Sequence, residues 1–312
     1  MLRPIFLALS RRPALAQFAL RHPVLRRAAL RFVAGERLDE AVSAVRALNA
    51  AGLAATLDLL GENTATPAAA AASAEAYLAI LDALHRTAVD SNLSLKLTQL
   101  GLDLDEAMCE TFLARILDRA GETFVRIDME GSAYTERTLR LCKRLWGAGR
   151  RNVGVVIQSY LRRSEADVEE LIALGARVRL VKGAYAEPPS VAYPHKRDVD
   201  AAFARLAERL LRDGVYPAIA THDERLIAAA RRVAIRDGIP PVRFEFQMLY
   251  GIRRDLQASL RREGYRVRVY VPFGGEWYPY FMRRLAERPA NLMFIVGSLL
   301  RERDGGRPGR VA

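Results

Sequence analysis

The sequence predicts a closed parallel (β/α)8 barrel of the TIM type. Short runs rich in β-branched and apolar residues alternate with segments of helical periodicity, and the alternation repeats eight times within 312 residues. Strict alternation of strand and helix indicates a parallel sheet, and eight repeats in a chain of this length favour a closed barrel over an open, doubly wound sheet. With 51% hydrophobic residues the chain can bury one large core, so we expect residues 1–312 to form a single domain.

The elements follow in order from a helix expected at 38–50, which ends before Gly52. The expected strands are 54–60, 93–98, 124–129, 154–158, 178–182, 216–220, 242–246 and 267–271. Apolar residues recur at helical spacing between them, over 68–88, 104–120, 135–149, 164–174, 198–213, 223–237 and 252–263. A final helix of about three turns is expected from Trp277 to Arg288, because Pro279 suits a first helical turn and Pro289 stops the helix.

Basic charge is concentrated at the start of the chain. Residues 1–35 hold seven Arg and no acid, out of a net charge of +12 for the whole chain. This segment mixes Arg with apolar residues and predicts one or two short amphipathic helices, since its apolar runs are too short to cross a membrane. A targeting segment, a membrane-surface contact and an outer helix of the fold all have this composition. We favour a folded outer helix that contacts an anionic membrane surface, and we expect residues 305–312 to form a loose tail.

Metal, disulfide and Rossmann-type sites are not predicted. Cys109 and Cys142 lie in helix-like stretches without metal-ligand neighbours, which favours a reducing, cytoplasmic location. None of the four His has a partner at the spacing of metal ligands, so no catalytic metal is expected. No Gly-x-Gly-x-x-Gly follows a strand and opens a helix, which argues against a dinucleotide bound in the Rossmann manner.

Polar residues gather at the expected strand ends. Active sites of (β/α)8 barrels lie at the C-terminal ends of the strands and in the loops that follow. The residues there are Lys96, Thr98, Gln99, Asp128, Glu130, Gln158, Tyr160, Arg179, Lys182, Tyr185, Thr221, His222, Asp223, Glu245, Gln247 and Tyr270. Ordinary barrel-end ion pairs would account for about half of such a set. They do not account for the hydrogen-bonding group of Gln158, Arg179 and Lys182.

The C-terminal helix adds two adjacent cations. Tyr280, Arg283, Arg284 and Glu287 fall at i, i+3, i+4 and i+7, so they share one helix face. Two neighbouring guanidiniums repel each other unless an anion lies between them, and the planar fork of Arg matches a carboxylate or a phosphate. The alternative is a solvated surface helix with an ion pair between Arg283 and Glu287.

Three classes of function fit these residues. One is a cofactor enzyme that holds a redox group across the barrel, with the two arginines binding an anionic substrate. The second is a Schiff-base aldolase, in which a desolvated Lys182 or Lys96 is the nucleophile. The third is a nucleic-acid-binding protein, suggested by the net charge and a pI near 10.1. The third is disfavoured because most of the excess charge lies in residues 1–35 and no basic stripe is interleaved with aromatic residues.

The motifs at the strand ends resemble those of proline dehydrogenase, the FAD-dependent enzyme of proline catabolism, in its monofunctional bacterial form. The resemblance runs from about Phe32 to Phe294. Its most specific parts are the segments LKLTQLG (95–101), RIDME (126–130), RLVKGAY (179–185), ATHD (220–223), EFQMLYG (245–251) and YFMRRLAE (280–287). Each is weak alone, but six in order at the ends of an expected barrel are specific.

The resemblance implies a distorted barrel with extra N-terminal helices and a last helix that lies over the barrel opening. It implies oxidation of L-proline to Δ1-pyrroline-5-carboxylate, the first step of proline catabolism to glutamate, with hydride transfer to N5 of FAD and electrons passed to a quinone. Hydroxyproline is an open alternative substrate. The positions that match the substrate site are Lys96, Asp128, Tyr185, Leu249, Tyr270, Tyr280, Arg283 and Arg284.

A second set of positions matches the cofactor site. The set is Gln158, Arg179, Lys182, Gly183, Ala184, Thr221, His222, Gln247, Arg284, Glu287 and Phe294. The resemblance implies that Arg179 lies near the flavin N5 and Gln158 at the pyrimidine side, and it makes Arg179, Lys96 and Asp128 the expected catalytic residues. One departure is Arg288, where the family is expected to have Asn. A cationic clamp on the substrate carboxylate also disfavours the ammonium form of proline, which must lose a proton before hydride leaves the ring.

Overall fold

Eight parallel strands close into a barrel in the order in which they occur in the chain. The computed structural model describes residues 30–287, with the side chains of 283–287 excepted. The strands are β1 Ala54–Leu59, β2 Ser91–Leu95, β3 Val125–Ile127, β4 Val153–Gln158, β5 Val178–Val181, β6 Ala218–Ala220, β7 Glu245–Leu249 and β8 Val267–Phe273. Pairing of β1 with β8, with Ala55 opposite Val269, closes the ring. The predicted parallel (β/α)8 barrel is therefore confirmed.

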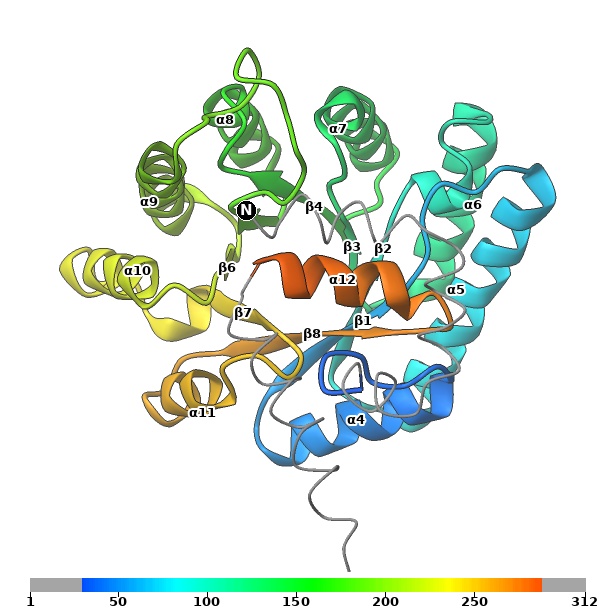
Figure 1. Ribbon diagram of the computed structural model, residues 1–312, viewed down its shortest axis with the longest axis horizontal. Coiled ribbons are helices and arrows are strands. Elements are labelled where there is room, and N and C mark those ends of the chain that lie inside the picture. The colour runs from blue at the N-terminus through cyan, green and yellow to red at the C-terminus, as the bar shows by residue number, and fades with distance from the viewer. Residues whose placement is uncertain (1–29, 288–312) are drawn as a thin grey trace, which may run out of the picture.

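Helices surround the barrel, as Figure 1 shows. They are α4 Leu38–Ala50, α5 Pro67–Thr87, α6 Glu106–Ala120, α7 Ser132–Gly147, α8 Ser164–Leu174, α9 Lys196–Asp213, α10 Glu224–Arg236, α11 Arg254–Arg262 and α12 Trp277–Glu287. Two short 3-10 helices, η1 Thr98–Leu100 and η2 Pro241–Arg243, follow β2 and precede β7. Within residues 30–287, the helices predicted between 38 and 287 form, with ends shifted by a few residues.

The seventh strand is the largest correction to the predicted elements. It was expected at 242–246, but β7 runs from Glu245 to Leu249 because Pro241 opens a 3-10 turn instead. Proline fixes φ and lacks an N–H, so it suits the first position of such a turn and not a central strand. Val242, expected in the strand, is 64% exposed. The shift also moves Glu245 from the expected C-terminal end of the strand to its first residue.

The interior of the barrel is polar. Arg268 Nε lies 3.0 Å from Glu245 Oε1, and Arg126 donates to the carbonyl of Val155 at 3.0 Å. Apolar side chains such as Leu95 and Phe203 instead fill the layer between strands and helices. Barrels of this kind are usually filled by branched aliphatic residues. The C-terminal ends of the strands are here called the barrel mouth. Because the interior is charged, the mouth is lined by groups that can bind polar ligands.

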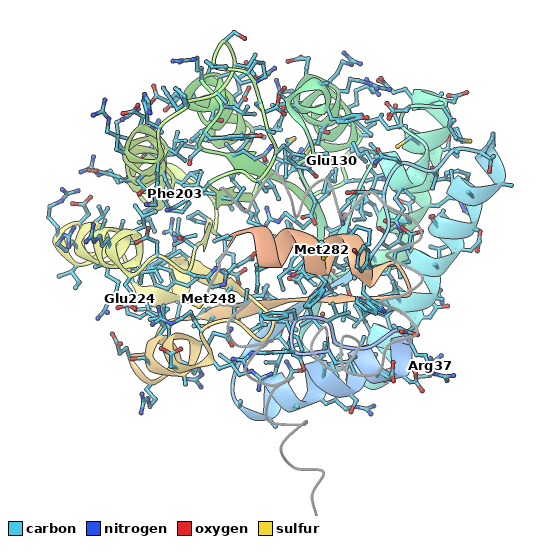
Figure 2. The ribbon with its side chains drawn as sticks, viewed as in Figure 1. Arg37, Glu130, Phe203, Glu224, Met248 and Met282 are labelled. Carbon is cyan, nitrogen blue, oxygen red and sulfur yellow. The ribbon has the colours of Figure 1, made fainter. Side chains whose placement is uncertain are left out.

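Helix α12 lies across the barrel mouth. Its residues Tyr280, Phe281 and Met282 form a buried cluster with Leu60, which follows β1, and Ile252, which follows β7. Both partners lie just beyond the C-terminal ends of their strands. Figure 1 shows α12 crossing in front of the strands, and Figure 2 shows Met282 over the centre of the barrel. The prediction that the last helix covers the mouth is confirmed.

The described chain begins beside this helix. Residues 30–33 form turns, and the Phe32 and Phe281 ring centroids are 6.2 Å apart. The amphipathic helices expected at the start of the chain and the tail expected at 305–312 lie outside the described residues. Among residues 30–287, the helices are all too short or too polar to cross a membrane.

Candidate active site

Asp128 is the centre of a partly buried hydrogen-bond network at the barrel mouth. Its Oδ1 accepts from Arg179 Nη1 at 2.7 Å and from the Ser94 hydroxyl at 2.9 Å. Its Oδ2 accepts from the Tyr270 hydroxyl at 2.7 Å. The donors come from β2, β5 and β8, whereas Asp128 follows β3. Contacts between strands that are not neighbours place these four side chains inside the barrel.

Arg179 keeps part of its hydrogen-bonding capacity unused. The residue is 4% exposed, and its guanidinium carbon lies 5.3 Å from the Tyr270 ring centroid. Within the described part of the chain, its Nε and Nη2 are buried without a hydrogen-bond partner. Buried donors are nearly always paired, since leaving one unpaired costs about 1–3 kcal/mol. These two atoms are buried donors that an acceptor on a bound molecule could satisfy.

Lys96 pairs with a carboxylate that the strand-end analysis missed. Its Nζ lies 3.0 Å from Oδ1 of Asp58, and both residues are buried. Burial alone lowers the pKa of Lys96, but the Asp58 and Asp128 carboxylates outweigh it and raise that pKa above its usual value. Asp58 lies inside β1, not after it. A signal for Asp58 is present in the sequence. Thr56 and Asp58 are the polar residues of β1, and their spacing of two places them on the same face of the strand.

The phenol of Tyr270 is held in its neutral form. Burial raises the pKa of Tyr270 well above its usual value, and the Asp128 and Asp58 carboxylates add to the increase. Tyr270 therefore acts as a hydrogen-bond donor to Asp128 throughout the physiological pH range. The network combines one ammonium, one guanidinium, two carboxylates and a phenol in a partly buried site.

Gln158, at the end of β4, is positioned by the loop after β3. Its Nε2 donates to the Glu130 carbonyl at 2.8 Å. The Glu130 carboxylate in turn accepts from Thr98, from the backbone N–H at 3.2 Å and from the hydroxyl at 2.6 Å. Burial raises the pKa of Glu130. These contacts hold the ends of β2, β3 and β4 in one fixed arrangement.

Lys182 lies between two carboxylates beyond β5. Its Nζ is 2.6 Å from Asp200 Oδ1 and 3.0 Å from Asp223 Oδ2. Thr221 supports this group, since its hydroxyl accepts from the Asp223 N–H at 3.1 Å. A Schiff base forms from a free amine, whereas this nitrogen is engaged by two acids. Asp200, on α9, is a further member of the site that the strand ends did not indicate.

Gly183 allows the chain to pass closely over Tyr160. Its φ is +113°, and an added Cβ would lie 2.3 Å from Tyr160 Cδ1. A side chain is excluded by the backbone conformation and by space, so this position requires Gly. Ala184 and Tyr185 follow on the exposed side of the turn, where Tyr185 is 36% exposed. Tyr185 therefore lies partly exposed in the loop after β5.

The ends of β6 and β7 are joined by a hydrogen bond. The Leu249 N–H donates to His222 Nε2 at 2.9 Å, which makes that nitrogen an unprotonated acceptor. Leu249 also packs against the α12 cluster. Gln247 instead donates to Glu245 inside the barrel. Glu245 therefore belongs to the polar interior with Arg268, and its predicted place at the mouth is wrong.

Helix α12 completes the description of the site. Tyr280 is 6% exposed and lies in the cluster that covers the mouth. The backbone of α12 is described as far as Glu287. The predicted roles of Arg283, Arg284 and Glu287 depend on side chains outside the described part, and Phe294 lies wholly outside it.

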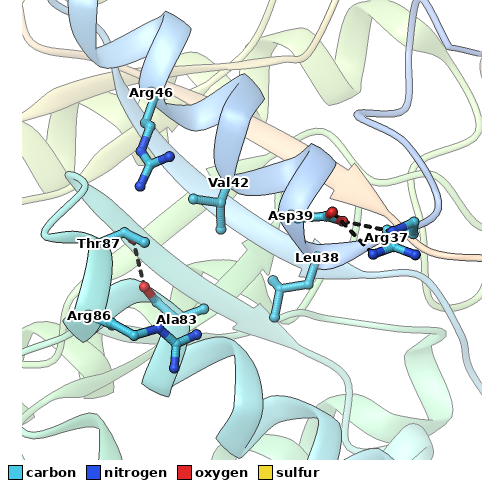
Figure 3. Close-up of a pocket in the computed structure, with 8 residues that line it drawn as sticks. All are labelled: Arg37, Leu38, Asp39, Val42, Arg46, Ala83, Arg86 and Thr87. Carbon is cyan, nitrogen blue, oxygen red and sulfur yellow. Dashed lines mark hydrogen bonds and ion pairs between the residues drawn. The ribbon is translucent and has the colours of Figure 1, made fainter.

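A separate groove lies on the outer surface. It has a volume of ≈ 570 Å³ and runs between α4 and the end of α5. Its lining includes Leu38 and Val42 with the exposed guanidiniums of Arg46 and Arg86, and Arg37 is paired with Asp39 at its edge (Figure 3). The groove shares no residue with the mouth network, so it is not part of the candidate active site.

A proline dehydrogenase family model matches residues 41–296, which is more than half of the chain. The chain belongs to the proline dehydrogenase family. Proline dehydrogenase 1 of Bacillus subtilis (strain 168) is 44% identical over 307 residues, which are 97% of this chain and 100% of the relative. Proline dehydrogenase of Deinococcus radiodurans is 43% identical over 305 residues, 96% of this chain and 98% of the relative.

A solved structure agrees with this assignment. Proline utilization A (PutA) from Bdellovibrio bacteriovorus, inactivated by N-propargylglycine, aligns with a TM-score of 0.79 at 28% identity. The alignment covers 84% of this chain and 32% of PutA. The family resemblance read from the strand-end motifs is confirmed, and the chain is an enzyme of the proline dehydrogenase type. This assignment displaces the aldolase and the nucleic-acid-binding protein.

Proposed function

We propose that this enzyme binds FAD and oxidises L-proline to Δ1-pyrroline-5-carboxylate, the first step of proline catabolism to glutamate, and that its electrons pass to a quinone. The observation that carries the proposal is the partly buried network of Asp128, Arg179 and Tyr270 in the mouth of a proline dehydrogenase-type barrel. This network supplies the two Arg179 donors that have no partner among the described residues. It also places fixed charges next to Lys96.

The residues present fit a flavin. Arg179 offers two buried donors without partners among the described residues, as the acceptor atoms of an isoalloxazine require. We assign Arg179 and Gln158 to the isoalloxazine and the positions Lys182, Gly183, Ala184, Thr221, His222, Gln247, Arg284, Glu287 and Phe294 to the rest of FAD. When bound, FAD supplies the hydride acceptor at N5.

The substrate carboxylate requires cations. We assign it to Lys96, Arg283 and Arg284, because a guanidinium pair binds a carboxylate in a bidentate way and a buried ammonium adds a third charge-assisted contact. Asp58 and Asp128 hold Lys96 in its charged form. Tyr185, Leu249, Tyr270 and Tyr280 would then enclose the apolar ring of proline.

The same charges favour the reactive form of the amine. The Asp128 carboxylate already accepts from Arg179, Ser94 and Tyr270, so its charge is neutralised before a substrate arrives. A site with cations at the carboxylate and no free anion beside the amine disfavours the ammonium form of proline. The rigid pocket then contributes by orientation, because a fixed approach of reacting atoms lowers the barrier by avoiding the entropy cost of their encounter.

The acceptor side of the reaction extends the proposal to the membrane. Quinones dissolve in the bilayer, and the seven Arg of residues 1–35 would attract an anionic membrane surface. We therefore expect peripheral contact with the inner face of the cell membrane, with the described barrel on the cytoplasmic side.

The proposal is tested by identifying the cofactor and the product. The purified protein is denatured, and the released chromophore is compared with FAD and FMN by mass spectrometry. The native protein is then incubated with L-proline and a soluble quinone, and the products are analysed in the same way. The proposal expects FAD, a product two hydrogens lighter than proline, and one quinol for each product. A protein that binds no flavin, even after FAD is supplied, would contradict it.

A further inference from the structure

Asp58 is a buried carboxylate to which the proposed function assigns no contact with proline or FAD. It lies in β1, is 1% exposed and accepts from Lys96 Nζ at 3.0 Å through Oδ1. In the sheet it lies opposite Ser94, whose hydroxyl donates to Asp128. Asp58 is thus at the same level of the barrel as the network around Asp128.

Stability alone gives a weak reason for this ion pair. Removing two charges from water costs several kcal/mol per ion, and replacing a buried pair by apolar side chains is often neutral or stabilising. Barrel interiors of this type are well filled by branched aliphatic residues. Asp58 also leaves its Oδ2 buried without a hydrogen-bond partner in the described residues. The effect of Asp58 on the charge and position of Lys96 therefore explains the pair better than a contribution to stability does.

The charged and titratable groups that face Lys96 come from three elements. Asp58 lies on β1, Tyr77 on α5, and Asp128 and Glu130 follow β3. Asp58 exerts the strongest attraction on the ammonium, and Asp128 the next strongest. Without Asp58, Lys96 would either lose its proton through burial or be drawn toward Asp128. The second outcome would bring it into competition with Arg179, which donates to Asp128 at 2.7 Å.

We propose that Asp58 is a positioning residue, which holds the Lys96 ammonium charged and in place for the carboxylate of the substrate. This inference rests on the proposed function, in which Lys96 binds the carboxylate of proline. An ammonium carries three donors, and Asp58 Oδ1 takes one of them on the side of β1. The other donors are left for the substrate, and the fixed hydrogen bond to Asp58 sets their directions.

The test begins with Asp58→Asn, which keeps the shape and removes the charge. The KM for proline is expected to rise at least tenfold while kcat falls by a smaller factor. The increase in KM should grow as pH rises, because burial lowers the pKa of Lys96 and the variant lacks the Asp58 charge that opposes this effect. The state of Lys96 is followed directly by NMR of ¹⁵N-labelled lysine side chains. The chain has four lysines, at 96, 143, 182 and 196, so the Lys96 signal is identified by its loss in Lys96→Met.

Two further variants separate positioning from a structural role. Asp167→Asn removes a carboxylate of similar burial, 4% exposed, which pairs with Arg163 at 2.9 Å on the outer helix α8. It should lower stability without changing the pH profile of KM. The double variant Asp58→Asn/Lys96→Met removes both charges together. The double variant should bind proline no more weakly than Lys96→Met alone. This comparison tests the positioning role of Asp58 even if Asp58→Asn alone does not fold.

The outcomes distinguish this inference from the proposed function. If wild-type flavin is not reduced by proline, the proposed function fails and the role of Asp58 with it. If wild type is active but Asp58→Asn keeps the wild-type KM and Lys96 titration at every pH, Asp58 is not a positioning residue. The inference is also overturned if Asp58→Asn weakens proline binding by the same factor with and without Lys96.

Discussion

Arg179 and Asp128 form an ion pair of 2.7 Å inside the barrel mouth, and the pair occupies only one of the three guanidinium nitrogens. Asp128 orients the guanidinium, and Ser94 and Tyr270 orient Asp128. The other two nitrogens are held in place without a partner in the described chain. This is the arrangement expected of a preorganised donor, which spends no energy on reorientation when charge develops on a bound group.

Arg179→Met removes these donors. In the anaerobic reaction with proline, the flavin should be reduced about 100-fold more slowly, as for the loss of one preorganised donor in other enzymes. Apparent proline affinity should change by a smaller factor. Stopped-flow absorbance measures both quantities. Arg115→Met, which breaks an exposed pair with Glu75 between α6 and α5, is the control. An unchanged reduction rate in Arg179→Met would remove the assigned role near N5.

Arg283→Ala and Arg284→Ala test the carboxylate clamp. Each variant should lose one charge-assisted interaction, about 1.5–3 kcal/mol, and so raise the KM for proline about 10- to 100-fold. Bound FAD should be retained, at least in Arg283→Ala. Arg262→Ala, at the end of α11 and exposed, serves as the control. Normal proline kinetics in both variants would show that these arginines do not bind the carboxylate.

Trp277 anchors the helix that covers the site. It is 2% exposed, its Nε1 lies 3.2 Å from Glu36 Oε1, and its ring centroid is 6.1 Å from that of Phe281. Trp277→Ala should lower the free energy of unfolding by about 3–5 kcal/mol. It should also lower kcat/KM for proline, because α12 loses its fixed position over the mouth.

The other tryptophan provides the control for this prediction. Trp146, on α7, is 7% exposed and donates to the Val153 carbonyl at 3.0 Å, away from the mouth. Trp146→Ala should cost similar stability, measured by urea unfolding, while the KM for proline stays unchanged. Equal effects of the two variants on KM would mean that α12 acts on the site no more than any other helix.

Ion pairs join successive helices around the barrel and predict its acid stability. The pairs between neighbouring helices or their caps include Arg115–Glu75, Arg144–Glu110, Arg163–Glu136, Arg205–Glu165, Arg236–Glu208 and Arg253–Glu224. Arginine partners lower the pKa of Glu106, Asp118 and Glu136 below the usual values. A lowered carboxylate pKa stabilises the fold above the unfolded-state pKa, about 4, and this stabilisation is lost as pH falls through the lower folded-state value.

Glu106→Gln tests the contribution of these ion pairs between helices. Glu106 contacts Arg140 and Arg144 at 2.9 Å each. The variant should lose about 1 kcal/mol of stability at pH 7 and low salt, and less than that at pH 3 or in 1 M salt, where the pairs are weakened in both proteins. Glu122→Gln, in an exposed loop, is the control. Thermal unfolding across pH and salt measures the difference. A loss that is the same at every pH would contradict the electrostatic explanation.

The sequence was a good guide to the fold because each element carries a local signal. Helix α8 begins at Ser164 and ends before Gly175, as its apolar spacing predicts. The C-cap glycine and the periodicity indicate the same end. Strand β7 was misplaced because Val242 and Phe246 have strand-like side chains, whereas Pro241 decides the backbone of this segment. Backbone constraints from a single proline outweighed side-chain propensity there.

The site was only partly predictable for a different reason. Lys96 and Asp128 were found because they directly follow strands, where such barrels carry their active sites, whereas Arg179 and Tyr270 were found as polar residues of the fifth and eighth expected strands. Asp58 and Ser94 also lie inside strands but were not singled out, and Asp200 lies on a helix. Their roles depend on partners 18 to 38 residues away along the chain. Only the closed barrel brings such pairs together.

The most direct test of the central claim is the visible spectrum of the purified enzyme, recorded without oxygen as L-proline is added. The account predicts flavin absorbance bands that bleach on addition of proline and return when a quinone is supplied. A bound flavin that stays oxidised in excess proline would contradict proline as the substrate. A protein that remains colourless after incubation with FAD would contradict the flavin assignment itself.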